Sequence, residues 1–127
     1  MGTDWDELAR RIEAAEDGTS ADSVSRWKAL FAPGGTYQDP VNPPTTDLDA
    51  IARQTQDVLP DWRVAVTRIF GSGNLAAAEW LGTGTLMGQM QIELHGYALI
   101  ELDDAGLILT WRDYFDQKEI ESQLTPS

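Results

Sequence analysis

The stretch TWRDYFD, residues 110–116, decides both the fold and the chemistry that the sequence predicts. Its alternation of aromatic and polar residues is typical of a β-strand, in which successive side chains point to opposite faces. Trp111, Asp113 and Phe115 therefore share one face, and Arg112 lies on the other. A carboxylate on an aromatic face is costly unless it is hydrogen-bonded or borders a cavity. Asp113 is consequently the first candidate for a functional side chain.

The composition indicates a globular protein, and we expect residues 1–127 to form a single domain. The net charge of −12 argues against nucleic acid or an anionic membrane surface as a partner, because both need a basic surface. The chain has no cysteine, which excludes disulfides and thiol catalysis. It shows no apolar run long enough to span a membrane and no signal-peptide pattern, so we expect a cytoplasmic protein.

Helices come first along the chain, and strands follow. Apolar residues recur at helical spacing over residues of about 4–16, 21–31 and 47–58, and residues 36–39 form a short extended segment. Four strands separated by turns are predicted at about 61–70, 75–86, 90–102 and 107–116, with a short helix from Gln117. This order predicts an α+β protein with a strongly curved, mostly antiparallel sheet wrapped around three N-terminal helices.

Small residues gather on the predicted inner face of two strands. Trp80, Gly82 and Gly84 share one face of strand 75–86, and Gly96 and Ala98 lie on the apolar face of the next strand. These small side chains leave volume that a ligand or the helices would fill, and we expect a ligand cavity there. The alternative for the aspartate that faces this space is a structural hydrogen bond to a buried Arg, Tyr or Trp.

A second carboxylate lies in the segment TYQDP, residues 36–40. Tyr37 and Asp39 share a face by alternation, which makes both candidates for the same site. The alternative for Asp39 is an Asx turn ahead of Pro40. His95 is the only histidine and falls on the outer face of its strand, where a surface or interface position is favoured over a metal site.

Two segments resemble a known family. LFAPGGTYQDPV at residues 30–41 and GLILTWRDYFD at residues 106–116 are similar to the SnoaL-like branch of the nuclear-transport-factor-two-like superfamily. The resemblance covers the chain from about Val24 to about Phe115. It implies a cone-shaped α+β fold with a pocket at its open end, often dimeric through the outer face of the sheet. It does not fix the function, because the superfamily hosts several activities.

Three groups in this superfamily give different expectations. Asp113 and Tyr37 match residues of limonene-epoxide hydrolases, but Trp80 and Gly82 stand where those enzymes carry Arg and a second Asp. Asp39 matches the base of ketosteroid isomerases, whose oxyanion-binding Tyr has no equivalent in the first helix here. Ala98 stands at the position of their second oxyanion-binding group. Asp113 also lies close to the position of the acid/base Asp of SnoaL-type polyketide cyclases. Of the three matches, this one depends least on residues that the chain lacks.

The resemblance therefore implies an acid/base cyclase or isomerase for an apolar, oxygenated substrate of the polyketide, terpenoid or steroid kind, with no metal and no organic cofactor. Asp113 would be the main catalytic group, with Asp39 and Tyr37 assisting. The expected substrate-binding residues are Trp62, Trp80, Gly82, Ala98, Trp111 and Phe115.

Two alternatives remain open: an epoxide hydrolase in which Asp113 and Asp39 hold the water, and a non-catalytic binding or dimerisation module. We also expect a homodimer through the outer sheet face. The residues expected on that face are Gln91, His95, Tyr97, Arg112 and Tyr114.

Overall fold

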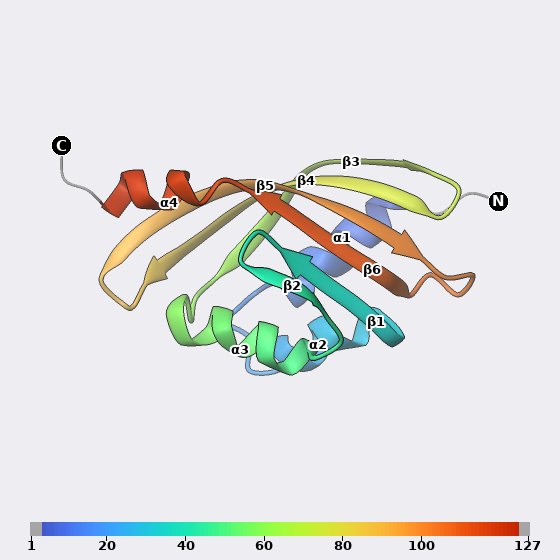
Figure 1. The fold of residues 1–127 in the computed structure, drawn as a ribbon, viewed down its shortest axis with the longest axis horizontal. Helices are drawn as coiled ribbons and strands as arrows, with labels where there is room; N and C mark the ends of the chain where they lie inside the picture. The colour runs from blue at the N-terminus through green and yellow to red at the C-terminus, as the bar shows by residue number, and fades with distance from the viewer. Residues whose placement is uncertain (1–3, 125–127) are drawn as a thin grey trace.

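The computed structural model describes residues 4–124, which form four helices and one six-stranded sheet (Figure 1). In chain order the elements are α1 (Trp5–Ala15), α2 (Ser23–Ala29), β1 (Phe31–Asp39), β2 (Asn42–Thr45), α3 (Leu48–Val58), β3 (Arg63–Ser72), β4 (Leu75–Leu86), β5 (Met90–Leu102), β6 (Ile108–Phe115) and α4 (Gln117–Leu124). The predicted α+β class is confirmed.

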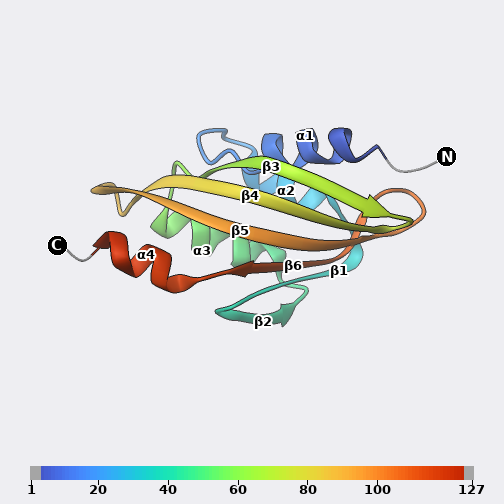
Figure 2. The same cartoon turned by 90° about the horizontal axis from the view of Figure 1, so that it is seen from above.

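The sheet is curved and open, with strand order β2-β1-β6-β5-β4-β3. All neighbouring strands are antiparallel except β1 and β6, which run parallel. Helices α1, α2 and α3 lie on one side of the sheet, and α4 continues the chain past the end of β6 (Figures 1 and 2). Within residues 4–124, the helices are too short or too polar to cross a lipid bilayer.

The structure differs from the sequence prediction around residue 31. The second helix ends at Ala29, and the short extended segment predicted at 36–39 is the last part of the longer strand β1. Pairing with a distant segment explains the change, because Phe31 lies opposite Ile108 and the Ile108 N–H donates to the Leu30 carbonyl at 2.8 Å. Gly34, with a φ of +78°, lies in the irregular stretch that follows, where glycine is favoured.

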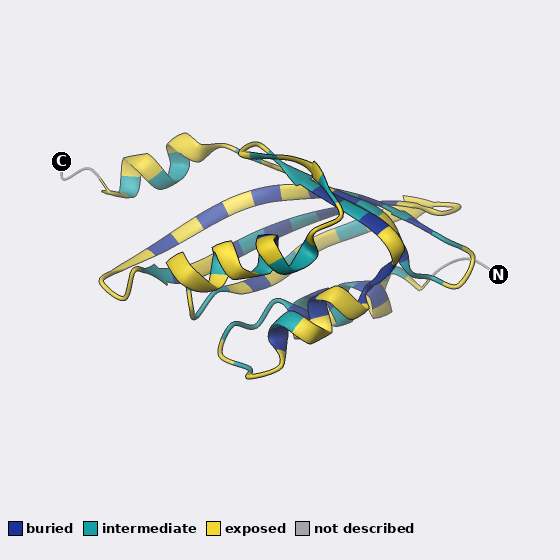
Figure 3. Ribbon diagram, turned by 60° about the horizontal axis from the view of Figure 1, so that its bottom comes forward, coloured by how far each residue is buried: buried dark blue, intermediate teal, exposed yellow. Residues whose placement is uncertain are grey.

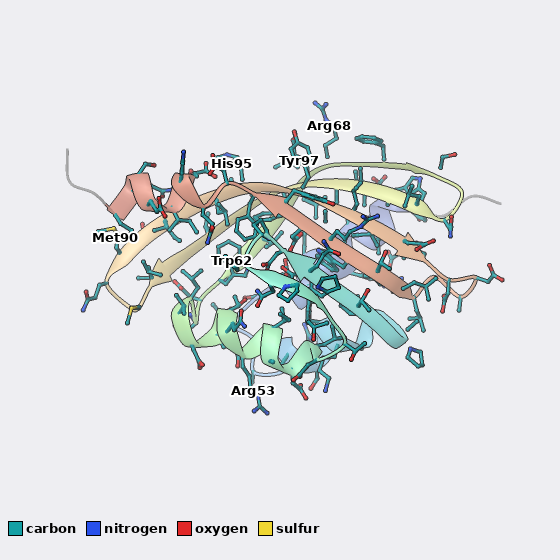
Figure 4. All side chains as sticks on the ribbon, in the orientation of Figure 1. Arg53, Trp62, Arg68, Met90, His95 and Tyr97 are labelled. Carbon is teal, nitrogen blue, oxygen red and sulfur yellow. The ribbon has the colours of Figure 1, made fainter. Side chains whose placement is uncertain are left out.

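Strand β5 shows how the core is built. Buried and exposed residues alternate along it, with Ile92, Leu94 and Ile100 facing the helices while His95 and Tyr97 point away from them (Figures 3 and 4). The predicted apolar face of this strand is confirmed by that burial pattern. Side chains from α1, α2 and α3 complete a single hydrophobic core against this face.

The small residues of the inner face make room for indole rings. A Cβ atom added at Gly82 would overlap the ring of Trp62, and one added at Gly96 would overlap the ring of Trp80. The expectation that Gly82 leaves free volume is therefore wrong, because Trp62 lies between the sheet and α3 and occupies that space (Figure 4). Ala98 is 1% exposed and is packed in the core in the same way.

Helix α4 is attached to β5 where β6 has ended. The pairing of β5 with β6 stops at Gly96, and the N–H groups of Glu93 and His95 beyond it donate to the side chains of Gln123 (2.8 Å) and Glu119 (2.7 Å). Gln123 Nε2 also donates to the Glu93 carbonyl at 2.7 Å. The His95 ring is exposed on the outer side and contacts Glu119 at 2.6 Å. Side chains of α4 thus satisfy backbone groups that have no strand partner.

The close contact at Gly82 predicts a loss of stability in Gly82→Ala. The added methyl group meets the Trp62 ring, which has to move away from its packed position, and we expect the free energy of unfolding to fall by about 1–3 kcal/mol. Urea denaturation measures this change. Gly84→Ala is the matched control, since its new methyl group would meet the flexible end of Leu59 at 3.1 Å. Equal losses in the two variants would contradict the explanation.

Candidate functional site

A cavity of about 450 Å³ lies between the helices and the inner face of the sheet. The cavity is lined by residues from the end of α1, strand β1, the C-terminal half of α3, strands β3–β6 and helix α4. Most of the wall is apolar, and Trp62, Trp80, Leu94, Phe115 and Ile120 contribute to it. The polar residues that line it are Glu16, Tyr37, Asp39, Asn42, Gln54, Thr55, Asp57 and Asp113.

Asp113 lies on the cavity wall and is held by three hydrogen bonds. Its Oδ1 accepts from the indole N–H groups of Trp111 (2.8 Å) and Trp80 (3.2 Å), and its Oδ2 accepts from the hydroxyl of Tyr37 (2.8 Å). Burial raises the pKa of Asp113 to about 6, although these three donors act in the opposite direction. The carboxyl group therefore changes its protonation state close to neutral pH.

Tyr37 connects the two candidate aspartates. Its hydroxyl oxygen lies 2.8 Å from Asp113 Oδ2 and 2.9 Å from Asp39 Oδ2. Burial and the adjacent carboxylates raise the pKa of Tyr37 far above its usual value, so the phenol keeps its proton. The hydroxyl has one proton, so the two carboxyl groups compete for a single hydrogen bond from Tyr37.

Asp39 combines the two roles that the sequence left open. Its Oδ1 accepts from the backbone N–H groups of Val41 (2.9 Å) and Asn42 (2.8 Å), which makes the turn expected ahead of Pro40. Its Oδ2 accepts from Tyr37 and lies on the cavity side. Asn42 exchanges two hydrogen bonds with Gln54 of α3, so this turn is also tied to the helix that closes the cavity.

Glu16 is a site residue that sequence reasoning missed. It follows the last residue of α1, and among residues 4–124 no group hydrogen-bonds to its carboxyl. Burial, together with the nearby charge of Asp113, raises the pKa of Glu16 to about 8. The spacing offers a signal, because Glu16 follows the buried residues Leu8 and Ile12 at intervals of four and so continues their side of the helix at its C-cap.

The structure places the predicted substrate-binding residues differently. Trp62, Trp80 and Phe115 line the cavity, with ring centroids 6.3 Å apart for the two tryptophans and 6.2 Å for Trp80 and Phe115. Trp111 is 2% exposed and does not line the cavity, but its indole N–H donates to Asp113, which does. Gly82 and Ala98 do not line this cavity, since one is covered by an indole and the other lies in the core.

Two other hollows, of about 610 and 580 Å³, lie elsewhere on the molecule, and neither contains Asp113, Asp39 or Tyr37. No group of three or more His, Cys, Asp or Glu side chains within residues 4–124 is arranged to hold a metal ion. The cavity with the hydrogen-bonded aspartate is therefore the candidate site.

An α+β cone with a hydrogen-bonded aspartate on the wall of a mostly apolar cavity is the class of protein that this fold and site define. The model of the SnoaL-like domain matches residues 12–111, and the chain belongs to that family. No curated protein sequence matches the chain.

Solved structures share the fold at low sequence identity. A protein of Catenulispora acidiphila with a ketosteroid isomerase-like fold, in complex with trimethylamine, has a TM-score of 0.80 at 20% identity over 92% of this chain and 91% of its own. A putative SnoaL-like polyketide cyclase of Jannaschia has a TM-score of 0.79 at 16% identity, with coverage of 100% and 98%. An LEH-like epoxide hydrolase of M. tuberculosis has a TM-score of 0.71 at 21% identity, with coverage of 96% and 92%.

The raised pKa of Glu16 predicts a pH-dependent stability. The folded protein binds this proton more tightly than the unfolded chain, so the stabilisation is complete below pH 4.5 and is lost as the pH rises through about 8. Between pH 6 and 8 we expect the wild-type free energy of unfolding to fall by about 1–3 kcal/mol, whereas Glu16→Gln stays nearly level. Denaturant titrations at several pH values measure this. The control is Glu7→Gln, at an exposed position of the same helix, and equal slopes in the two variants would contradict the assignment.

Proposed function

We propose that the protein is a cytoplasmic, cofactor-independent acid/base enzyme of the cyclase or isomerase type. Its substrate is an apolar, oxygenated small molecule of the polyketide, terpenoid or steroid kind. The observation that supports this most directly is a hydrogen-bonded Asp113 on the wall of a mostly apolar cavity. Such an environment turns an ordinary carboxyl group into an acid/base group that works near neutral pH.

Asp113 is oriented to act as a base. A carboxylate offers about four lone-pair sites, and the two indoles and Tyr37 occupy three of them. The remaining site is on Oδ2, beside the Tyr37 hydroxyl. With a pKa of about 6, Asp113 is mostly ionised at neutral pH and still basic enough to accept a proton from carbon.

The cavity wall favours an uncharged substrate. Trp62, Trp80 and Phe115 supply large apolar surfaces, and no Lys, Arg or His lies among the lining residues. Four acidic side chains line the same cavity, so a substrate carboxylate or phosphate would be repelled. A neutral ketone or ester can bury its rings against the aromatic groups.

One proton transfer serves both reaction types. Asp113 removes a proton from the carbon next to a carbonyl group, and the electron pair of the C–H bond moves through the new C=C bond onto the carbonyl oxygen. Return of the proton at another carbon completes an isomerisation. In an aldol cyclisation the enolate carbon instead attacks a second carbonyl of the same molecule, whose C=O electron pair moves onto its oxygen, and that alkoxide takes the proton back from Asp113.

Epoxide hydrolysis is the second candidate. The oxygens of Tyr37, Asp39 and Asp113 form a continuous hydrogen-bonded row that would hold a water molecule. Trp80, which stands where limonene-epoxide hydrolases carry Arg, donates its N–H to Asp113. A non-catalytic binding module is the third candidate. The hydrogen bonds to Asp113 that it predicts are present, but it also predicts a collapsed or filled pocket, and a cavity of about 450 Å³ lies beside Asp113 instead.

Asp113→Asn tests the proposed function. Deuterium exchange from D₂O into cyclic ketones and isomerisation of a β,γ-unsaturated steroid ketone are the assays, with NMR as the readout. We expect wild-type kcat/KM to rise through about pH 6 and the variant to lose about 10²–10⁴-fold in kcat. Asp104→Asn, at an exposed turn position, is the control and is expected to retain activity.

Each contrary result selects another candidate. Unchanged turnover in Asp113→Asn would remove this residue from the mechanism. Diol formation from limonene epoxide without ketone exchange would establish epoxide hydrolysis instead. Ligand binding without either reaction would establish the binding module.

We also propose a homodimer through the outer face of the sheet. Tyr97 and Tyr114 lie opposite each other in neighbouring strands and are 56% and 44% exposed. They border a hollow of about 580 Å³ together with His95. Exposed aromatic side chains of this kind are enriched in the centres of protein interfaces.

The dimer predicts a specific effect of Tyr97→Glu. A charge at the centre of the interface would be desolvated on association, so the variant is expected to be a monomer where the wild type is a dimer. Light scattering at micromolar concentration distinguishes the two. Met87→Glu, at an exposed turn, is expected to remain dimeric, and a monomeric wild type would exclude the dimer.

A further inference from the structure

Glu16 is held in place from both sides. Its N–H donates to the Ile12 carbonyl at 2.9 Å, and its own carbonyl accepts from the Val64 N–H of β3 at 3.2 Å. Gly18, two residues later, donates to the Trp62 carbonyl at 2.7 Å. The backbone is therefore fixed against β3, and the side chain lines the cavity.

The surroundings favour the neutral form of this carboxyl group. Three donor groups lie within hydrogen-bonding distance of the Asp113 carboxyl and four of the Asp39 carboxyl, the Tyr37 hydroxyl being common to both, whereas no described group donates to Glu16. Glu16 also sits at the C-terminal end of α1, where the partial negative charge of the helix disfavours a carboxylate. A neutral carboxylic acid is a hydrogen-bond donor, and its proton is directed at a cavity that is also lined by the proposed base Asp113.

We propose that the Glu16 carboxyl group donates a hydrogen bond to the carbonyl oxygen of the substrate and stabilises the enolate that forms when Asp113 removes the proton. This inference rests on the proposed function and deepens it, because it names the substrate class as enolisable ketones or esters. The C–H proton moves to Asp113 Oδ2, and the negative charge that develops on the substrate oxygen is held by the Glu16 proton, which stays on Glu16.

The two groups are complementary. Their pKa values of about 6 and about 8 leave a window in which Asp113 is an ionised base and Glu16 a neutral donor. The other titratable groups on the cavity wall are Asp39, Tyr37 and Asp57. Arg63, on the neighbouring strand, is exposed and pairs with Asp17.

The first test uses the ketone assays. Glu16→Ala is expected to lower kcat by about 10²–10³-fold, and Glu16→Gln, which keeps a donor, to stay within about tenfold of wild type. Wild-type activity should decline above about pH 8, and Glu16→Gln should lack this decline. Glu7→Gln is the control on the exposed face of α1 and should match the wild type throughout. Normal turnover with an unchanged pH profile in both Glu16 variants would overturn the inference and leave the proposed function standing.

The second test needs no turnover. β-Naphthol, whose oxygen imitates an enolate, is titrated by fluorescence into Asp113→Asn, which imitates the protonated base. Adding Glu16→Leu should weaken binding at least about tenfold, while adding Glu16→Gln should not. The inference would be overturned if naphthol did not bind, or if it bound equally to all variants. Tetramethylammonium is titrated as a cationic comparison, and its preferential binding through an ionised Glu16 would also overturn the inference. These outcomes count whatever the ketone assays show.

Discussion

The hydrogen bond from Tyr37 to Asp113 joins side chains that are 76 positions apart in the chain. It exists because β1 runs parallel to β6 and brings Tyr37 beside Trp111 in the sheet. Parallel neighbours need a long connection, and here helix α3 and strands β2–β5 together make that connection. The chemistry of the cavity therefore depends on the complete sheet, since no local segment of the chain contains both ends of the hydrogen-bonded row.

The shape of the cavity depends on two glycines, whose lack of a side chain makes room for indole rings. Gly96 has no Cβ, so the Trp80 ring can lie directly against it, and the indole N–H donates to Asp113. Gly82 accommodates Trp62 in the same way, and the two indoles meet edge to face. Glycine inside a strand costs conformational entropy. In this fold that cost is offset by the burial of two large rings that also define the shape of the cavity.

Much of the fold followed from the period of the apolar residues, and part of the site did too. Alternation placed Asp113 between Trp111 and Phe115 on the inner face and put Tyr37 with Asp39. Alternation predicts on which face of the sheet a side chain lies, but not how far the side chain extends over the neighbouring strand. It therefore did not show that Trp62 fills the space over Gly82. The full length of β1 and the position of Glu16 beside the cavity depend on contacts with β6 and β3, which are distant in sequence.

Helix α4 also changes what the sheet offers to other molecules. Where β6 stops, the N–H groups of Glu93 and His95 would form an open strand edge, but Gln123 and Glu119 already occupy them. Open edges of this kind are the places where sheets of separate molecules join and aggregate. The C-terminal helix thus acts as a cover against intermolecular strand addition, and it does so with side chains rather than with a seventh strand.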